Sequence, residues 1–365
     1  MPTPDPAAFR AQFPVLERLS YLNAGTEGPV PRRAAEAAHQ RIDQELTGGR
    51  CGRPYFDELI GLAVSLRAAY ARVLGAQDTE VALTGSTTDG VNTVLSGLDL
   101  RPGDEIVTSD EEHPGLLAPL GRAHRRFGVS VKVVPFTDIA AGVSDKTRLV
   151  ACSHVSWVSG RVLDMAAVRS TGVPVLLDAA QALGAIPLDV SALGCDYYAA
   201  SGQKWLCGPE GSGCLYVRPD RLDELVVPWP GYGSLADPQR ALDVMPAEGT
   251  RRLDHGFPVG LRTAWAVASL QVFEEAGWPW VHERAISLAG QLATRLADLG
   301  LAVRERGPST LVSWAVQDAE AEVQRLAAQG VIVRSIPGPG LIRASVGAWS
   351  SEDELEELAR LAAGR

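Results

Sequence analysis

Short β-rich runs alternate with helical runs between residues 81 and 217, and this alternation restricts the fold more than any other feature. Apolar residues recur at helical spacing between the β-rich runs, for example in Gly90–Gly97 and Gly115–Phe127. The segments predicted as strands are Glu80–Leu83, Glu105–Thr108, Val129–Val134, Leu149–Ser153, Val175–Asp178, Tyr197–Ala199 and Gly213–Val217. The pattern predicts an α/β fold with a mainly parallel seven-stranded sheet and helices on both faces.

Polar groups follow five of these strands at the point where each strand ends. The segments that carry them are Thr84–Thr88, Glu111–Pro114, His154–Trp157, Asp178–Gln181 and Ser201–Lys204. Ligands of open α/β sheets bind beyond the carboxyl ends of the strands. We therefore expect these groups to converge on one edge of the sheet.

The length of 365 residues exceeds the size at which one hydrophobic core stops growing. We expect a large domain over residues 21–250 and a smaller C-terminal α/β domain over residues 251–365, where a β-α-β-β-α pattern begins at Leu301. Residues 1–20 are expected to pack near the smaller domain. Helical spacing also predicts long helices, at Arg32–Leu46, Phe56–Leu74, Thr263–Glu275 and Trp280–Leu299.

Composition argues against several classes of partner. A formal charge of -10 and a pI near 5.2 disfavour nucleic acid and anionic membrane surfaces. No apolar run is long enough to cross a bilayer, and the first residues do not resemble a signal peptide. The five cysteines show no C-x-x-C spacing and no histidine cluster accompanies them, so we expect neither a metal site nor a disulfide framework. A cytoplasmic protein fits these features best.

Lys204 is one of only three lysines, in a chain whose positive charge comes almost entirely from arginine. A lysine amine can condense with an aldehyde, which a permanently protonated guanidinium does not do. Asp178 ends the buried run Val175–Asp178 on the preceding strand. The pair predicts pyridoxal 5′-phosphate (PLP), with Lys204 as its Schiff-base lysine, Asp178 beside the pyridine nitrogen and Gln181 near the phenolic oxygen. The alternative is an aspartate that caps a helix and a lysine there by chance.

Gly85–Gly90 opens a helix after a strand and supplies free N–H groups and hydroxyls. A helix N-terminus of this kind binds anions, and the phosphate of PLP is the anion expected here. The residues predicted to bind it are Thr87, Thr88, Ser201 and Gln203. Ser or Thr at such a position also serves as an ordinary N-cap, which is the alternative.

Two further residues match this chemistry. His113 follows a strand and could stack on the cofactor ring or carry a proton, or it could be a polar loop residue. Arg343 lies in an apolar strand and could bind a substrate carboxylate bidentately, or it could be an edge-strand arginine paired with an acid. His154 is predicted either to line the pocket or to form a structural hydrogen bond. Tyr55, Trp157 and Tyr232 are candidates for pocket walls or for plain packing.

Taken in order along the chain, these residues resemble the class V aminotransferase group of fold-type I PLP-dependent enzymes. That group includes cysteine desulfurases, selenocysteine lyases and isopenicillin-N epimerases. The segments that carry the resemblance are Tyr21–Asn23, Gly85–Asn92, Glu112–His113, Ser153–Ser156, Leu177–Gln181, Ser201–Gly213 and Arg343–Glu354. The resemblance implies catalytic roles for Lys204, His113 and Asp178, and substrate binding by Arg343 and Asn23. It also implies a homodimer whose shared active sites are completed by Leu253–Pro258 of the other subunit.

The chain departs from the group at three places. Gln203 stands where many desulfurases have histidine, and Phe257 stands near the place of a phosphate-binding threonine. The loop Val333–Gly340 lacks the cysteine with which desulfurases accept sulfur. Cys207 and Cys214 are expected to be core residues rather than substitutes for it.

The sequence therefore predicts a PLP-dependent enzyme that acts at the Cα of a small amino acid. A C–S or C–Se β-lyase without an acceptor-loop cysteine is the first expectation, followed by an epimerase and a class V aminotransferase. A binding protein that keeps the fold without catalysis is an alternative of another class. A nucleotide-binding protein is disfavoured, because neither G-x-G-x-x-G nor G-x-x-x-x-G-K-[ST] follows any strand.

Overall fold

The central feature of the computed structural model, which describes residues 4–254, 256, 258–338 and 340–364, is a seven-stranded sheet. Its strands are β2 (Val81–Thr84), β3 (Glu105–Ser109), β4 (Ser130–Val134), β5 (Thr147–Ser153), β6 (Val175–Asp178), β7 (Tyr197–Ser201) and β8 (Gly213–Val217). They are ordered β2-β8-β7-β6-β5-β3-β4, and only β8 runs against its neighbours. The predicted α/β class and all seven predicted strands are confirmed.

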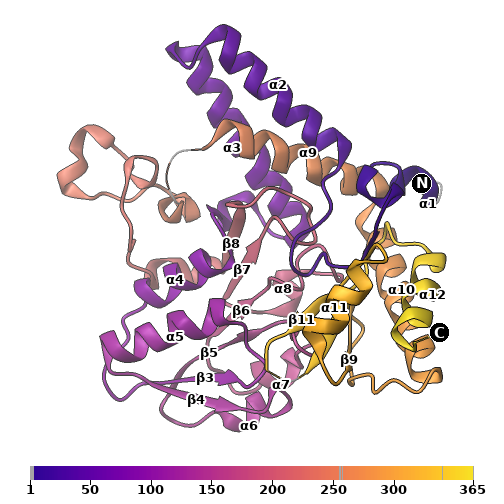
Figure 1. Cartoon of the computed structure of the whole chain (residues 1–365). Helices are drawn as coiled ribbons and strands as arrows, with labels where there is room; N and C mark the ends of the chain where they lie inside the picture. The colour runs from indigo at the N-terminus through magenta and orange to yellow at the C-terminus, as the bar shows by residue number, and fades with distance from the viewer. Residues whose placement is uncertain (1–3, 255, 257, 339, 365) are drawn as a thin grey trace.

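Helices cover both faces of this sheet, so its central strands β6, β7 and β8 are buried at every position. On β6, Leu176 packs with α4 (Thr87–Gly97) and α5 (Pro114–Phe127), while Leu177 packs with α3 (Gly52–Leu74) on the other side. Figure 1 shows α4 and α5 along one face. Shorter helices occupy the other crossovers: α6 (Ile139–Gly142), α7 (Met165–Arg169) and α8 (Val190–Leu193).

A helical hairpin formed by α2 (Arg32–Gly48) and α3 extends away from the sheet, with α9 (Gly260–Ala276) packed along it (Figure 1). Helix α3 begins at Gly52, four residues earlier than the predicted Phe56. Pro54 falls in its first turn, where the missing N–H has no intrahelical partner to lose. The proline is therefore compatible with the helix instead of separating two helices.

The C-terminal part forms a smaller antiparallel sheet with the order β11-β12-β9. Its strands are β9 (Leu311–Ala315), β11 (Arg334–Ile336) and β12 (Leu341–Ser345), and its helices are α10 (Trp278–Asp298), α11 (Ala319–Ala327) and α12 (Glu352–Ala362). In the paired strands, Arg334 lies opposite Arg343. This register becomes important below, because it places two cations side by side.

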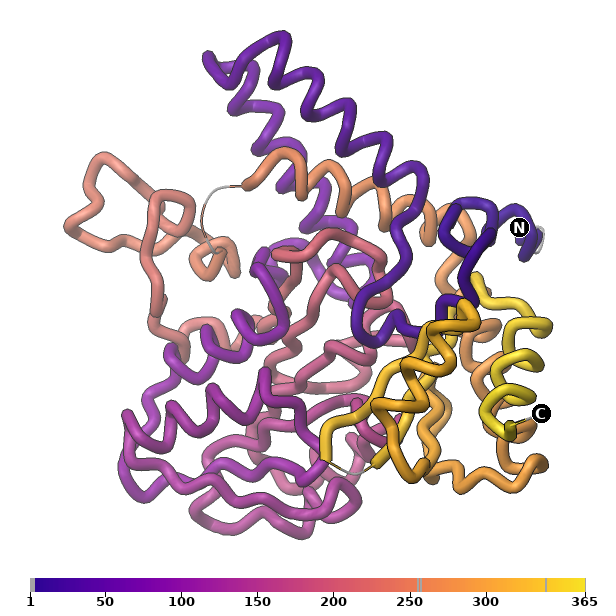
Figure 2. The backbone as a smooth tube through the Cα atoms, in the orientation of Figure 1, coloured from indigo at the N-terminus to yellow at the C-terminus, as the bar shows by residue number. Residues whose placement is uncertain are grey.

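The N-terminal segment lies against this C-terminal part, as the indigo and yellow tubes of Figure 2 show. Strand β1 (Ser20–Tyr21) pairs in parallel with β10 (Val331–Ile332), and Asn23 bridges to Ser345. The same segment carries α1 (Pro6–Arg10). Short 3-10 turns connect other elements: η1 (Pro14–Glu17), η2 (Asp78–Glu80), η3 (Phe136–Asp138), η4 (Pro219–Glu224), η5 (Tyr232–Ser234), η6 (Pro238–Asp243) and η7 (Gly249–Leu253).

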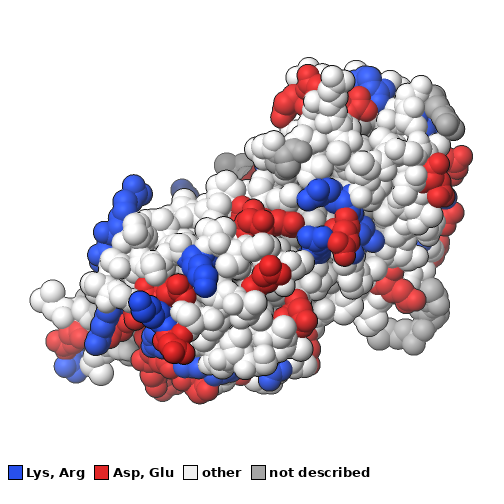
Figure 3. Space-filling view, turned by 90° about the horizontal axis from the view of Figure 1, so that it is seen from below, with Lys and Arg blue, Asp and Glu red and all other residues white. Residues whose placement is uncertain are grey.

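Two surface properties bear on the expected partners. Among the described residues, the helices are all too short or too polar to span a bilayer. On the face seen in Figure 3, Lys and Arg side chains lie close to Asp and Glu side chains, and broad uncharged areas separate these mixed groups.

Candidate active site

Asp178 and Lys204 meet at the carboxyl ends of β6 and β7. Asp178 is 5% exposed, and Ala180 N–H donates to its Oδ1 at 3.0 Å. Burial raises the pKa of Asp178, while the charge of Lys204 and the Ala180 N–H oppose that rise. Burial also lowers the pKa of Lys204 to about 8, against the attraction of Asp178. The site therefore holds a lysine whose uncharged amine is accessible near neutral pH, beside a buried acid.

The N-terminus of α4 points to the same edge. Ser86 caps the helix by accepting from Asp89 N–H at 3.1 Å. The next residue, Thr87, donates its N–H to Ser201 Oγ at 3.0 Å, and the two hydroxyl oxygens lie 2.7 Å apart. Gly90 allows this close approach, because a Cβ there would lie 2.8 Å from the Cβ of Ala199 on β7. Two hydroxyls are thus gathered at the N-terminus of one helix, the end that favours an anion.

The N-terminus of α5 meets that of α4. His113 caps α5, and its Nδ1 accepts from Gly115 N–H at 3.0 Å. A Cβ on Gly115 would lie 2.6 Å from Thr88 Oγ1, so the threonine hydroxyl borders the histidine. Burial, followed by the charges of Lys204, Arg334 and Arg343, lowers the pKa of His113 to about 4. The ring is neutral at physiological pH, and because Nδ1 accepts, its proton is on Nε2.

Gln181 is locked in the wall of the site. Its Nε2 donates to Gly25 O at 2.7 Å, and its Oε1 accepts from Trp205 Nε1 at 3.1 Å. Gln203 is held by its backbone, because its carbonyl accepts from Gly28 N–H at 2.8 Å. The side-chain Oε1 of Gln203 is buried without a hydrogen-bond partner. Both predicted residues therefore lie at this edge, and one of them has an unused polar atom.

Arg343 is fully buried and has no acidic partner among the described residues. Its Nη1 donates to Trp157 O at 3.0 Å, while Nε and Nη2 have no hydrogen-bond partner. Burial, with a contribution from Arg334, lowers its pKa to about 9. Strand β12 is central in its sheet, so Arg343 is not an edge-strand arginine paired with an acid. An unpaired buried guanidinium indicates an anion that binds from outside the chain.

Gly25 joins Arg343 to the rest of the site. A Cβ at Gly25 would lie 2.7 Å from Ser345 Oγ, 2.8 Å from Arg343 Nη2 and 2.8 Å from Gln181 Oε1. The Ser345 hydroxyl is also buried without a partner. Asn23 lies in the same turn and accepts from Thr26 Oγ1 at 2.7 Å. All ten predicted site residues therefore belong to one contiguous group at the end of the sheet.

Arg334 is the most informative residue that the sequence analysis missed. It lies opposite Arg343 in the β11–β12 register, and its Nη1 donates to Thr26 Oγ1 at 3.2 Å. Its guanidinium carbon lies 5.8 Å from the centre of the Trp157 ring. Counting outward from the turn at residues 337–340 would have paired the two arginines, so a signal was present. Like charges that face each other across strands are unfavourable without a shared counterion.

Glu112 belongs to a segment that was expected at this edge, but no role was predicted for its side chain. Its buried carboxylate accepts from Ser109 Oγ at 2.5 Å, from Ser153 N–H at 3.0 Å and from Ser153 Oγ at 2.5 Å. Burial raises its pKa to about 7, although these hydrogen bonds oppose the rise. The carboxylate joins the ends of β3 and β5, which supports the position of His113, the next residue along the chain.

The other candidates divide into near and distant residues. The centres of the Trp157 and His113 rings lie 4.8 Å apart, with an interplanar angle of 85°. His154 Nδ1 is 2.9 Å from the buried Tyr198 hydroxyl, a structural hydrogen bond. Tyr55 lies beneath Arg41 on the helical hairpin, and Tyr232 is 73% exposed. The two candidate core cysteines, Cys207 and Cys214, are buried, and burial raises their pKa values.

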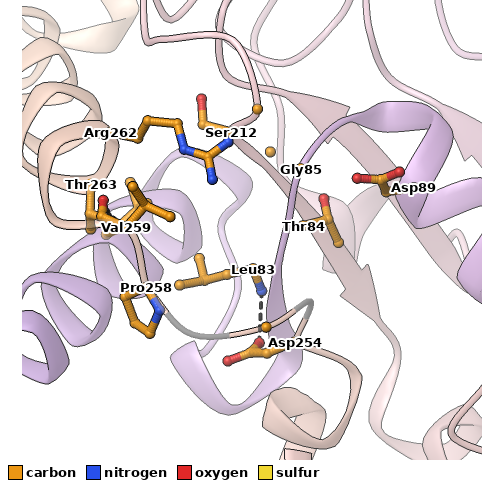
Figure 4. Close-up of a pocket in the computed structure, with 14 residues that line it drawn as sticks. Leu83, Thr84, Gly85, Asp89, Ser212, Asp254, Pro258, Val259, Arg262 and Thr263 are labelled. Atoms are coloured by element: carbon orange, nitrogen blue, oxygen red, sulfur yellow. Dashed lines mark hydrogen bonds between the residues drawn. The ribbon is translucent and has the colours of Figure 1, made fainter. Parts of the chain in front are cut away.

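A cavity of ≈ 240 Å³ lies beside the turn at residues 85–90, between β2 and the start of α9. Figure 4 shows Arg262 extending from α9 toward Ser212, with Thr84 and Asp89 on the opposite wall. Asp254 accepts from Leu83 N–H at 2.9 Å in the same view. Asp254 and Pro258, which also line the cavity, belong to the segment expected to reach the other subunit. Phe257 of that segment lies outside the described residues.

Comparisons with known proteins agree with this geometry. The family model for aminotransferase class-V matches residues 55–358. Isopenicillin N epimerase of Streptomyces clavuligerus is 33% identical over 225 residues, which cover 56% of this chain and 54% of that protein. A cysteine desulfurase of Salmonella typhimurium is 32% identical over 249 residues, or 62% of this chain and 61% of that protein. The chain thus spans little more than half of the curated relatives it matches.

Solved structures extend the similarity over nearly the whole chain. The cystine C–S lyase C-DES, in complex with its product cysteine persulfide, is 30% identical with a TM-score of 0.90, covering 96% of this chain and 99% of that one. A C-DES mutant with glycine covalently linked to its PLP cofactor is 31% identical with a TM-score of 0.91, covering 99% of both chains.

Proposed function

Because the chain belongs to the aminotransferase class-V family, we propose that it is a PLP-dependent enzyme that cleaves the Cβ–S bond of a sulfur-bearing amino acid. The reaction is a β-elimination. For cystine and one water molecule, the products are pyruvate, ammonia and cysteine persulfide, which balance all atoms. Cysteine persulfide is the product described for C-DES, the related lyase.

The residues at the sheet edge fit PLP. Lys204 would bond to the aldehyde carbon, Asp178 would keep the ring nitrogen protonated, and the His113 ring would lie against the ring face. The group proposed to hold the phosphate is Thr87, Thr88, Ser201 and Gln203, of which Gln203 has the orphaned Oε1. When bound, PLP supplies a ring that accepts the electron pair left at Cα.

Lys204 is assigned as the base that removes the proton from Cα. Its lowered pKa of about 8 leaves a substantial fraction of the amine uncharged near neutral pH, as a general base requires. The charge of Asp178 opposes the lowering of this pKa. Gln181, fixed by Gly25 and Trp205, is proposed to face the phenolic oxygen.

The single observation that carries the lyase proposal is the pair of unneutralised arginines beside Lys204. Arg343 would bind the α-carboxylate of the substrate, with Asn23 nearby, and Arg334 would bind a second carboxylate. A disulfide amino acid such as cystine has both groups. The loop at residues 333–340 contains no cysteine, so the persulfide would leave with the product instead of being transferred to the enzyme.

Epimerisation is the second candidate, because isopenicillin N epimerase is among the relatives. It needs a second acid–base group on the face of Cα opposite Lys204. His113 fills that role poorly, because its Nδ1 is held by Gly115 N–H and its pKa is about 4. Amino transfer is the third candidate.

A homodimer with shared active sites is also proposed. Apolar side chains are exposed on the helical hairpin and on the segment leading to α9: Ile42, Leu46, Phe56, Ile60, Val64, Trp229, Leu242, Met245 and Val259. A second copy of the chain would cover them and bring residues 253–258 to the partner site. We also propose a large domain over residues 21–250, a smaller domain over residues 251–365 with residues 1–20 packed near it, and a cytoplasmic location.

The test is a product assay with the holoenzyme and cystine. The lyase proposal expects pyruvate and ammonia in equal amounts, with persulfide detected by cyanolysis. Exchange of the α-hydrogen for deuterium without pyruvate would support epimerisation, and conversion of an added keto acid into the corresponding amino acid without pyruvate would support amino transfer. Either result contradicts the lyase proposal.

A further inference from the structure

Glu27 is an acidic residue in the wall of the site that the proposed chemistry does not use. Its backbone is fixed on both sides: its carbonyl accepts from the Tyr21 hydroxyl at 3.1 Å, and the following Gly28 N–H donates to Gln203 O at 2.8 Å. A Cβ on Gly28 would lie 2.1 Å from Lys204 O. Glu27 is therefore held one residue away from a direct backbone contact with Lys204.

The Glu27 carboxylate is half-buried and makes no hydrogen bond or ion pair within the described part of the chain. Burial raises its pKa to about 7, the charge of Glu210 adds to the rise, and Lys204 opposes it. Lys204 is reserved for the cofactor, so it is not a lasting counterion. With Lys204 bonded to the cofactor, the described part of the chain supplies no cation that pairs with the Glu27 carboxylate.

The turn that holds Glu27 also holds Arg334. Thr26, the preceding residue, accepts from Arg334 Nη1, and both Thr26 N–H and Glu27 N–H donate to Asn23 O. One short turn thus joins an unpaired carboxylate to an arginine that has no acidic partner among the described residues. The turn therefore carries a carboxylate at Glu27 and contacts a guanidinium through the preceding Thr26, and one group of each sign is what the ammonium and carboxylate of an amino-acid head group require.

We propose that Glu27 binds the distal ammonium group of a substrate with two amino-acid head groups, while Arg334 binds its distal carboxylate. This inference rests on the proposed function and deepens it, because it selects disulfide diamino acids over amino acids with a simple thioether or thiol side chain. Glu27 acts by recognition and takes no part in breaking the Cα–H or C–S bond. It also disfavours side chains that end in a carboxylate alone, through like-charge repulsion.

The test measures equilibrium binding to the holoenzyme with two analogues that contain no sulfur and so do not eliminate. In 2,7-diaminosuberate, two methylenes replace the disulfide of cystine, and 2-aminosuberate lacks only the distal ammonium. Dissociation constants come from the change in cofactor absorbance at pH 8, where Glu27 is ionised. We expect the diamino acid to bind roughly 10- to 100-fold more tightly, as for a hydrogen bond to a charged group.

In Glu27→Gln that preference should fall to about twofold or less, while the affinity for 2-aminosuberate stays the same or improves. The matched control is Glu210→Gln, which removes the neighbouring exposed carboxylate and should keep most of the preference. In the wild type, the preference should increase from pH 6 to pH 8 as Glu27 loses its proton. This pH dependence tests the claim without any substitution.

An unchanged preference in Glu27→Gln, or equal binding of the two analogues by the wild type at pH 8, would overturn the inference. Neither result bears on whether cystine yields pyruvate, so the lyase proposal stands or falls separately. Conversely, an enzyme that fails to eliminate cystine but shows the Glu27-dependent preference would keep this subsite and lose the lyase assignment.

Discussion

Replacing Arg343 with methionine separates a functional arginine from a structural one. The guanidinium is fully buried, makes one hydrogen bond, to Trp157 O, and has two nitrogens without partners. Its removal loses about 1 kcal/mol of hydrogen bonding but relieves the burial of an uncompensated charge, which is worth several kcal/mol. We therefore expect Arg343→Met to leave the free energy of unfolding unchanged or to raise it.

Binding should respond in the opposite direction. Truncating one partner of a buried charge pair weakens binding by about 2–5 kcal/mol, or roughly 30- to 5,000-fold in the dissociation constant of an amino acid. Urea unfolding of the apo-protein and spectral titration of the holoenzyme measure the two effects. Arg306 is the matched control, because its Nε donates to Leu311 O at 2.8 Å and it holds a loop within the chain. Arg306→Met should lose stability and keep affinity.

A functional role for Arg343 is contradicted if Arg343→Met unfolds about 3 kcal/mol more easily than the wild type and still binds amino acids normally. Such a result would assign Arg343 to the fold and leave the substrate carboxylate without a partner.

Three further predictions concern the cofactor pocket. In Gly28→Ala the new Cβ would lie 2.1 Å from Lys204 O, so the free energy of unfolding in urea should fall by about 1–3 kcal/mol. The control Gly121→Ala lies in open space on α5 and should raise the free energy of unfolding by about 0.5–1 kcal/mol. Equal effects of the two substitutions would contradict the proposed contact. Ser201→Ala removes the acceptor of Thr87 N–H and should weaken PLP retention about tenfold in equilibrium dialysis, and unchanged retention would exclude it from the phosphate site. The rate of PLP capture by the apo-protein should rise from pH 7 to pH 9 and then level off. With a pKa of about 8, about a quarter of the Lys204 amine is uncharged at pH 7.5, against roughly 0.1% for an ordinary lysine. A rate that still climbs beyond pH 10 would contradict the lowered pKa.

The strands and the position of Asp178 could be predicted because burial on both faces leaves a continuous apolar run such as Val175–Leu177. Lys204 could be predicted for the same reason, since it follows the next strand. Helix α3 was predicted to begin at Phe56 but begins at Gly52, because Pro54 fits the first helical turn.

Arg334 and Glu27 were missed for physical reasons. The position of Arg334 depends on strand register, which a turn of four residues determines and a hydrophobicity pattern alone does not. Glu27 lies in a Gly/Pro loop with no periodicity, and its position depends on contacts that the next residue, Gly28, makes with Gln203 and Lys204, which are distant in the sequence. Residues of this kind become visible only when the polar groups of the folded chain are examined for missing partners.

The proposed function requires a covalent bond between the Lys204 amine and PLP. Borohydride reduction of the holoenzyme, followed by proteolysis and mass spectrometry, tests it most directly. We expect a phosphopyridoxyl group on the peptide that contains Lys204, and none in Lys204→Ala treated in the same way. A modification confined to Lys132 or Lys146, or an unmodified Lys204 in a protein that retains its yellow cofactor, would contradict it.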